Sequence, residues 1–245
     1  MQTDIFLEKL TTYQDLKNAF HLRWKERIKN NDPFIVSGID CCLDIDGFDL
    51  NASHFGLFEA TSLEKKLIGY FRVITPQPTE TTAIIQQIAH DNSELLYEYI
   101  QKPLSAIFHT IKVFDNSPIL NTIYQNWTNK KLNIYEFSRL TVNSTYQHAR
   151  LSLFLIESAI NICDIYQIDG AIISVNVEHQ PIYLRYGFKI VAELNNHKIG
   201  PFNHSAMTIL KKDIPNAIIL KCKKRGKQLR VYDPLNKAAL KYRND

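Results

Sequence analysis

The chain has 245 residues, of which 45% are hydrophobic and 22% charged, and its formal net charge is +4. These values lie near the average of soluble globular proteins, so they exclude a disordered chain, a collagen-like repeat and a coiled-coil rod. No apolar run approaches the roughly 18 residues that a membrane-spanning helix needs. The four cysteines form no disulfide framework and the N-terminus has no secretory pattern, so we expect a cytoplasmic protein with reduced thiols.

The first half of the chain predicts a helix, a loop, a hairpin and several short helices. Apolar residues recur at a spacing of four over 14–29, which is typical of an amphipathic helix. Residues 33–53 have no clear period and are rich in Asp, which favours a loop. Two strands are predicted over 54–60 and 66–74, separated by a short polar turn as in a hairpin. Residues 81–130 predict helices in short pieces, one of them from Leu104 to Phe114.

The second half alternates strands with helices. Residues 132–143 predict a strand, 150–167 a helix that is apolar on nearly all sides, and 171–175 a short strand. A strand, helix and strand in this order are long enough for a right-handed parallel crossover. The elements that follow are a short helix over 178–186 and strands over 188–194 and 205–210. This order predicts one mixed α/β domain with three layers.

The C-terminal segment, residues 215–245, is strongly basic. It holds nine Lys or Arg against two acidic residues, a net charge of +7, whereas the whole chain carries +4. Such a segment indicates an acidic partner, which could be nucleic acid, an anionic membrane or an acidic protein; a solvated extension is the alternative. We therefore divide the chain into a domain of residues 1–214 and a basic extension. Within the extension, 217–221 and 229–232 could form two added strands.

Clustered carboxylates occupy the predicted loop, at Asp44, Asp46 and Asp49. Carboxylates at spacings of two and three can bind a cation or an ammonium group, and the alternative is a polar surface loop. An EF-hand is excluded, because Asp49 stands where a loop that begins at Asp44 needs glycine. A nonstandard calcium loop is a minor alternative. The eight histidines show no metal-ligand spacing, and neither a P-loop nor a GxGxxG motif is present. We therefore expect no metal site.

Charged residues inside predicted strands are the second signal. Glu136 and Ser138 share one face of their strand, and Phe137 and Arg139 are expected on the other. A carboxylate within a half-buried strand needs a partner or a function, and Glu becomes a suitable general base when burial raises its pKa. The alternative is a structural ion pair of Glu136 with Arg139 or with Arg72, which lies in an otherwise apolar strand.

In this order, the motifs resemble the acyl-homoserine-lactone synthase family and its relatives, the N-acyl amino acid synthases and other acyl-carrier-protein-dependent acyltransferases. The resemblance covers about residues 20–210. It consists of an Arg on the first helix, an acidic loop, a G-x-x-R strand, an E-x-S-R strand and the Y-x-x-x-G-F turn of GNAT acyltransferases. The matching residues are Arg23, Asp44, Asp46, Asp49, Gly69, Arg72, Glu136, Ser138, Arg139, Tyr183, Gly187 and Phe188.

The resemblance implies a GNAT-like acyltransferase fold of the α/β class: a mixed twisted sheet with helices on both faces and two central strands splayed apart to admit a pantetheine thioester. It implies that Glu136 is the general base for an amine acceptor and that Tyr183 protonates the leaving thiolate. Backbone N–H groups near Leu140 and Val142 would hold the oxyanion. The resemblance implies a substrate site formed by Arg23, Asp44, Asp46, Asp49, Arg72, Ser138 and Arg139.

Departures from the family pattern affect both substrates. The aromatic residue that the lactone synthases have four places after the helix Arg is Arg27 here, and Asn30 and Asn31 occur where a Trp is usual. We therefore expect an amino acid or another small amine as acceptor. The GNAT phosphate loop is missing after the Glu136 strand, which favours acyl-carrier protein over coenzyme A as the source of the acyl-phosphopantetheine thioester. No other cofactor is expected.

The sequence thus predicts an enzyme that moves a fatty acyl group from acyl-carrier protein, or from acyl-CoA, to the amine of an amino acid or similar molecule. The alternatives are an autoinducer (acyl-homoserine-lactone) synthase that uses S-adenosylmethionine, an acetyl-CoA-dependent N-acetyltransferase, and a non-catalytic GNAT-like binding module. The basic extension fits an acidic carrier protein and equally an anionic membrane surface. A nucleic-acid partner belongs to the binding-module alternative, and we do not expect it for the enzyme.

Overall fold

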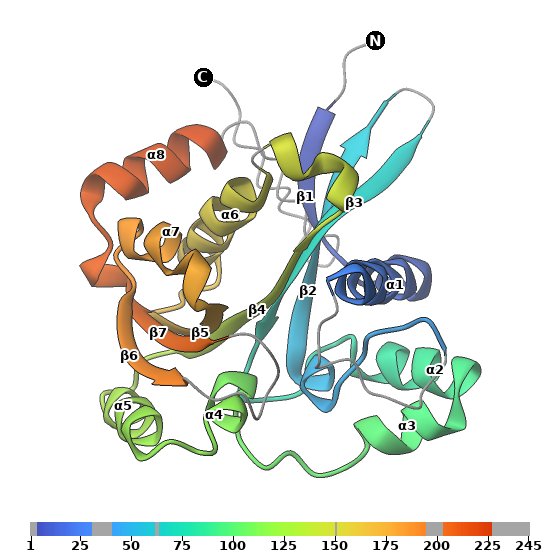
Figure 1. Ribbon diagram of the computed structural model, residues 1–245, viewed down its shortest axis with the longest axis horizontal. Helices are drawn as coiled ribbons and strands as arrows, with labels where there is room; N and C mark the ends of the chain where they lie inside the picture. The colour runs from blue at the N-terminus through green and yellow to red at the C-terminus, as the bar shows by residue number, and fades with distance from the viewer. Residues whose placement is uncertain (1–3, 31–40, 62–63, 150, 195–202, 227–245) are drawn as a thin grey trace.

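The computed structural model describes residues 4–30, 41–61, 64–149, 151–194 and 203–226. Its centre is a seven-stranded sheet in the order β1-β2-β3-β4-β5-β7-β6 (Figure 1). Neighbouring strands are antiparallel except for β4 and β5, which are parallel. The strands are β1 (Asp4–Lys9), β2 (Ala52–Ala60), β3 (Lys65–Ile74), β4 (Ile134–Val142), β5 (Gly170–Asn176), β6 (Lys189–Leu194) and β7 (His204–Leu210).

Helices cover both faces of the sheet, which confirms the predicted three layers and the mixed α/β class (Figure 1). On one side lie α1 (Tyr13–Lys29), α2 (Thr82–Asn92), α3 (Glu94–Ile100), α4 (His109–Val113) and α5 (Pro118–Asn129). On the other side lie α6 (Leu151–Ile165), α7 (Gln180–Arg185) and α8 (Asn216–Gly226). Short 3-10 helices include η1 (Gly47–Asn51), η2 (Ser144–Ala149), η3 (Val177–His179) and η5 (Lys211–Asp213). Among the described residues, no helix is long and apolar enough to cross a membrane.

Most predicted elements are present, and three differ. The edge strand β1 was not predicted. The segment 104–114 is helical only from His109 to Val113. Residues 217–221, for which the sequence allowed an added strand, belong to α8. The other expected added strand, 229–232, lies outside the described residues, and the division at residue 214 stays a prediction.

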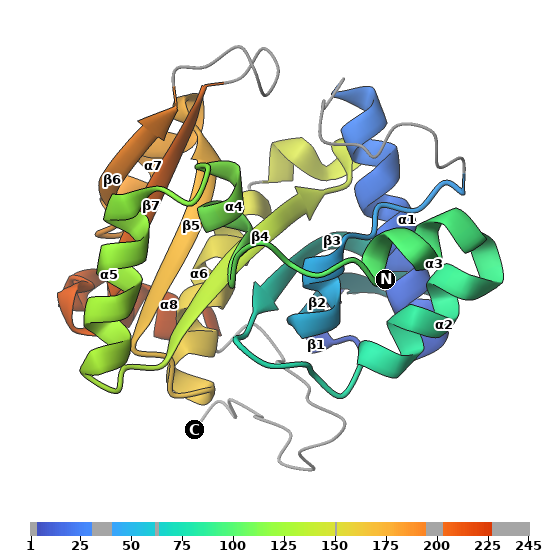
Figure 2. The ribbon, with the colours of Figure 1, turned by 90° about the horizontal axis from the view of Figure 1, so that it is seen from below.

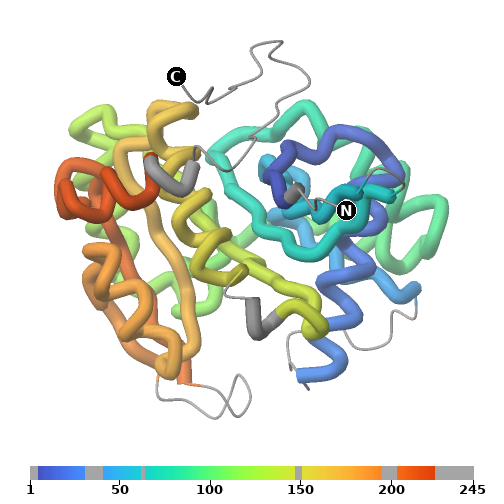
Figure 3. The backbone as a smooth tube through the Cα atoms, turned by 90° about the horizontal axis from the view of Figure 1, so that it is seen from above, coloured from blue at the N-terminus to red at the C-terminus, as the bar shows by residue number. Residues whose placement is uncertain are grey.

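Helix α6 is apolar on nearly all sides because it lies between the sheet and α8 (Figures 1 and 3). Leu155 and Ile162 pack in one apolar cluster with sheet residues such as Phe71. Ile156 belongs to a second cluster that includes Cys222 of α8. Ile218 and Ile219 pack in this second cluster together with Cys222, which lies four and three residues further along the helix, whereas Leu220 is exposed. This one-sided burial is that of a helix and explains why 217–221 does not form a strand.

Strands β4 and β5 separate soon after they begin. They pair over three residues of β4, from Ile134 to Glu136. Beyond Glu136, β4 stays paired with β3 as far as Val142, whereas β5 stays paired with β7 as far as Asn176. Figure 2 shows the two strands diverging. The expected splay of two central strands is therefore confirmed, and Glu136 lies where it opens.

A bulge in β4 follows directly after Ser138. Ser138 pairs with Arg72 and Thr141 with Tyr70, so β4 has one residue more than β3 over this stretch. The extra residue is accommodated at Arg139, whose φ of 57° is in the left-handed region. Side chains of a regular strand point alternately to the two faces of the sheet. A residue in the left-handed conformation interrupts this alternation, so the side chains at and after the bulge no longer follow it.

The prediction that Arg139 points away from Glu136 and Ser138 is therefore wrong. Arg139 Nη2 lies 2.7 Å from Asp46 Oδ2, the same carboxylate that Arg72 binds from its position opposite Ser138. The alternation rule assumes an unbroken strand, and the bulge invalidates it at this residue.

The N-terminus of helix α1 is stabilised by a side-chain cap, and a single substitution tests the contribution of this cap to stability. Thr12 is its N-cap, and the Thr12 side-chain oxygen accepts a hydrogen bond of 3.2 Å from the Asp15 N–H. Replacing Thr12 by Ala should lower the free energy of unfolding by about 1 kcal/mol, as measured by urea denaturation. The matched control is Thr11→Ala, which removes no cap. An equal loss in both variants would contradict the capping role.

Candidate active site

A buried cluster of arginines and aspartates joins the first helix, the acidic loop and the two central strands. Arg72 binds Asp46 with two nitrogens, at 2.7 and 3.1 Å, and its Nη1 lies 2.6 Å from Asp49 Oδ1. The Arg72 Nε also donates to Ser138 Oγ at 2.9 Å. The structure thus places four predicted site residues from three separate segments in contact.

Helix α1 contributes two arginines to the same cluster. Arg23 lies 2.8 Å from Asp49 and 3.1 Å from Asp44. Arg27 Nη1 lies 2.8 Å from both oxygens of Asp44. Sequence reasoning treated Arg27 as a departure from the family pattern and gave it no role. Its position four residues after Arg23 was the available signal, because this spacing places two side chains on one helix face.

The aspartates also shape their own loop. Asp46 Oδ1 accepts from the Phe48 N–H at 2.9 Å, and Asp49 Oδ2 accepts from the Asp46 N–H at 2.8 Å. This reciprocal pair caps η1. The three carboxylates bind guanidinium groups of the chain itself, so the interpretation of a polar surface loop is wrong. Within the described ranges, no group of three or more His, Cys, Asp or Glu could hold a metal ion.

The arginines determine the charge state of the cluster. Burial alone would raise the pKa of Asp44, but the positive charges of Arg23, Arg139 and Arg27 hold it well below its usual range. Arg72 and Arg139 lower the pKa of Asp46 in the same way. Both carboxyl groups are therefore ionised at neutral pH, and the cluster is a network of true ion pairs.

Sequence reasoning also missed His54 and Tyr70, which lie beneath the cluster. His54 Nε2 is 3.1 Å from the carbonyl oxygen of Asp49, and His54 Nδ1 is 2.7 Å from the Tyr70 hydroxyl. A carbonyl only accepts, so Nε2 carries the proton and Nδ1 accepts from Tyr70. Burial lowers the pKa of His54 to about 4, which keeps this imidazole neutral. The neutral pair of His54 and Tyr70 thus holds the acidic loop through the Asp49 carbonyl.

Glu136 is fully buried at the point where β4 and β5 separate. Its Oε2 accepts a hydrogen bond of 2.9 Å from the Thr110 N–H, and its Oε1 has no partner among the described residues. Arg72 and Arg139 bind Asp46 instead, so the alternative of a structural ion pair with Glu136 is wrong. Burial raises the pKa of Glu136 to about 7, although Thr110 and the charge of Arg72 oppose that shift.

A cavity of about 680 Å³ passes through the splay from one face of the sheet to the other. Its polar end, on the side of the acidic loop, is lined by Glu26, Arg27, Asn30, His109, Glu136, Ser138 and Arg139. Its other end lies under α6 and is mainly apolar. The apolar lining comprises Phe71, Phe137, Leu140, Val142, Ile156, Ile160, Cys163, Ile173, Tyr183 and Phe188.

The predicted site residues divide into two groups around this cavity. Glu136, Ser138, Arg139, Leu140, Val142 and Tyr183 line it. Arg23, Asp44, Asp46, Asp49 and Arg72 do not, and they hold the lining residues Arg27, Ser138 and Arg139 from behind. Helix α4 adds His109, whose pKa burial and the charge of Arg139 lower well below its usual range. Nothing in the sequence near 109 signals that it lies beside Glu136.

The ion pairs predict a specific loss of stability when one partner is removed. Asp46→Asn leaves the buried guanidinium of Arg72 and the partly buried one of Arg139 without full compensation, so we expect the free energy of unfolding to fall by roughly 3–5 kcal/mol at pH 7. A pKa lowered by folding stabilises the protein above the unfolded value of about 3.9, and this stabilisation declines as the pH falls. The difference between wild type and variant should therefore shrink near pH 3.

Denaturant titrations at several pH values measure this difference. Asp91→Asn is the matched control, because the Asp91 side chain is exposed and pairs with His90 rather than with an arginine. A difference that stays constant with pH would contradict the ion-pair explanation.

Three comparisons place this geometry among known proteins. The family model of the N-acyl amino acid synthase FeeM matches residues 95–207. FeeM from uncultured soil microbes has a solved structure that is 14% identical with a TM-score of 0.57, covering 86% of this chain and 93% of FeeM. No curated protein sequence matches the chain.

Two acyl-homoserine lactone synthases have similar folds. The CoA-dependent enzyme BjaI, with S-adenosylmethionine and isopentyl-CoA, is 14% identical with a TM-score of 0.57, covering 97% of this chain and 98% of BjaI. The synthase LasI is 17% identical with a TM-score of 0.50, covering 86% and 90%. The chain therefore has a GNAT-like acyltransferase fold, it resembles the N-acyl amino acid synthases and the acyl-homoserine lactone synthases, and these findings together support an acyltransferase enzyme.

Proposed function

We propose that the protein transfers a fatty acyl group from acyl-carrier protein to the amine of an amino acid or a similar small molecule. The observation that carries this proposal is the placement of Glu136. Its carboxyl group is buried, its pKa is raised to about 7, and it lines a cavity with a polar end and an apolar end. One end suits a polar acceptor and the other suits a fatty chain.

The chemistry follows from the two oxygens of Glu136. The Thr110 N–H holds Oε2, which leaves Oε1 to take a proton from the acceptor ammonium, directly or through one water. The neutral amine then attacks the thioester carbonyl, a C–N bond forms and the C–S bond breaks. Tyr183, which lines the same cavity, donates its proton to the leaving thiolate. The Tyr183 phenolate then recovers a proton from the nitrogen, directly or through water, because the nitrogen must lose a second proton to become an amide. Backbone N–H groups near Leu140 and Val142 stabilise the oxyanion.

The charge of the polar end supports an acceptor that carries a carboxylate. Four arginines face three aspartates in the cluster, so one positive charge is left over. Glu26, which also lines the polar end, pairs with Lys29 at 3.4 Å. Arg139 Nε has no partner among the described residues, and Arg139 lines the cavity. An amino acid supplies both the missing negative charge and the reacting amine. S-Adenosylmethionine also contains this group, but Arg27 stands where the lactone synthases have an aromatic residue.

Two features favour a carrier protein, and a third favours a long acyl group. The segment after β4 is the glycine-free 3-10 helix Ser144–Ala149 rather than a glycine-rich phosphate loop, which weakens the case for a nucleotide-bearing donor. The basic extension, of which 215–226 are described, is complementary to an acidic protein. The apolar end of the cavity is larger than an acetyl group needs, which favours fatty acyl transfer over acetylation.

Removing the proposed base should stop the reaction while the protein stays folded. Glu136→Gln keeps the shape of the side chain and cannot take a proton, so we expect turnover to fall by about 10²–10⁴-fold. In wild type, kcat/KM should rise with pH through about 7, as the carboxylate forms. Glu98→Gln, an exposed substitution on α3, is the control. Undiminished turnover of Glu136→Gln would contradict the assignment.

The same variant should be more stable than wild type at high pH. Folding raises the pKa of Glu136 from 4.5 to about 7, so the folded state holds its proton more tightly and loses that stabilisation as the pH rises through this interval. Glu136→Gln avoids the buried charge, so its free energy of unfolding should exceed that of wild type by roughly 3 kcal/mol at pH 8. Denaturation at pH 4 and pH 8 measures it. An equal difference at both pH values would contradict a raised pKa.

The donor is tested by comparing hexadecanoyl-acyl-carrier protein with hexadecanoyl-CoA on the full chain. We expect kcat/KM to be at least roughly tenfold higher with the carrier protein, and this preference should weaken as salt is added, because attraction between the basic extension and an acidic protein is screened. Equal values for both donors would contradict the preference for a carrier protein. A preference that salt does not change would contradict the role of the basic extension.

A further inference from the structure

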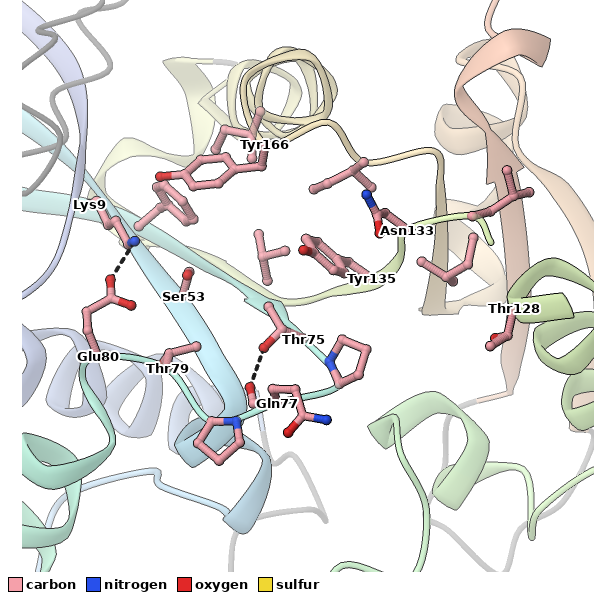
Figure 4. Close-up of a pocket in the computed structure, with 18 of the residues that line it drawn as sticks. Lys9, Ser53, Thr75, Gln77, Thr79, Glu80, Thr128, Asn133, Tyr135 and Tyr166 are labelled. Atoms are coloured by element: carbon pink, nitrogen blue, oxygen red, sulfur yellow. Dashed lines mark hydrogen bonds and ion pairs between the residues drawn. The ribbon is translucent and has the colours of Figure 1, made fainter. Parts of the chain in front are cut away.

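A second cavity, of about 610 Å³, lies under the C-terminal end of α6 (Figure 4). Its floor is formed by the α6-facing residues of three strands, among them Phe55 and Val73. Ile162 and Tyr166 of α6 line the side toward the helix. At its rim, Lys9 pairs with Glu80 at 2.5 Å. The lining is mixed: polar side chains such as Ser53, Thr75 and Asn133 line part of it, and the apolar part includes Phe55, Val73, Ile134, Ile162 and Ile168.

This cavity continues the line of the proposed acyl cavity along the same elements. On β4, Phe137 lines the acyl cavity and Tyr135 lines the second cavity. On β3, Phe71 lines the acyl cavity and Val73 lines the second cavity. Residues two apart on a strand share a face, and they are separated by about 7 Å. On α6, the neighbours Cys163 and Ile162 line the first and second cavity, respectively. The two cavities are therefore neighbours on the α6 side of the sheet, and the second one also reaches Tyr124 and Thr128 of α5.

A row of aromatic rings runs from the acyl cavity to the second cavity. The ring of Phe137 lies 6.4 Å from that of Phe71, which stacks on Phe55 at 5.2 Å. Phe55 in turn meets Tyr166 edge to face at 6.1 Å. The row begins in the acyl cavity and ends in the second cavity. Its three phenylalanines make no hydrogen bonds through their side chains, so displacing them breaks only apolar contacts.

We propose that the second cavity receives the distal end of long acyl chains, and that Phe137 and Phe71 form the barrier between the two parts of the path. This inference rests on the proposed function. A chain whose thioester lies beside Glu136 enters under α6, passes the barrier and ends among Phe55, Val73 and Ile168. Each further methylene that reaches this apolar lining strengthens binding roughly fourfold, so the second cavity favours long chains over short ones.

Two variants with opposite effects test the path. Ser53 lies at the second cavity and is only partly buried, so Ser53→Phe fills the cavity without replacing a core residue (Figure 4). It should lower kcat/KM for hexadecanoyl donors by roughly tenfold or more relative to octanoyl donors, the equivalent of about two buried methylenes. Phe137→Ala removes the barrier and should shift the same ratio toward the hexadecanoyl donor. Ser53→Ala, which keeps the cavity open, is the matched control.

Two readouts separate this inference from the proposed function. Mass spectrometry of products from a mixture of octanoyl and hexadecanoyl donors measures the ratio, and calorimetry with octanoic and hexadecanoic acids measures binding without turnover. If products form but neither variant changes their ratio, the path is overturned and the proposed function stands.

If no product forms while Ser53→Phe selectively weakens hexadecanoic acid, the proposed function falls and the path is supported. If there is neither product nor length-dependent binding, both are overturned. Phe137→Leu replaces Phe137→Ala should the latter not fold.

Discussion

The buried guanidinium of Arg72 is the constraint on which the rest of the site depends. A charge without exposure to water is costly unless it is paired and fully hydrogen-bonded, and Arg72 meets this condition through Asp46, Asp49 and Ser138. These partners belong to the acidic loop and to β4, and Arg23 then attaches α1 to the same carboxylates. The loop, the first helix and the central strands can therefore adopt only positions that complete this network.

The network matters for function because it holds β4 where its pairing is irregular. The bulge at Arg139 and the separation from β5 after Glu136 remove backbone partners that an ordinary central strand would have. The ion pairs of Arg72 and Arg139 with Asp46 compensate on the polar face. On the other face, α6 packs over the opened strands. The splay thus connects a charged region with an apolar one, and Glu136 lies between them.

Several parts of this arrangement could be predicted from the sequence. Periodicity indicated α1, the hairpin of β2 and β3, and the crossover through α6, because each is a local pattern with one buried face. The ordered motifs pointed to Arg72 and Glu136 as special, since a charge within an apolar strand is unusual whatever its partner. The direction of Arg139 was predicted wrongly, because one extra residue in a strand reverses the alternation and leaves no signature in composition.

The sequence by itself determined the elements, the α/β class and the charged residues that had to find partners. The tertiary structure alone decided which partners they found. Asp46 rather than Glu136 binds Arg72 and Arg139, and the N–H that holds Glu136 comes from Thr110, which is distant along the chain. The physical reason is that a pKa and a binding face depend on distances, burial and opposing charges, and these quantities exist only once the separate segments are packed together.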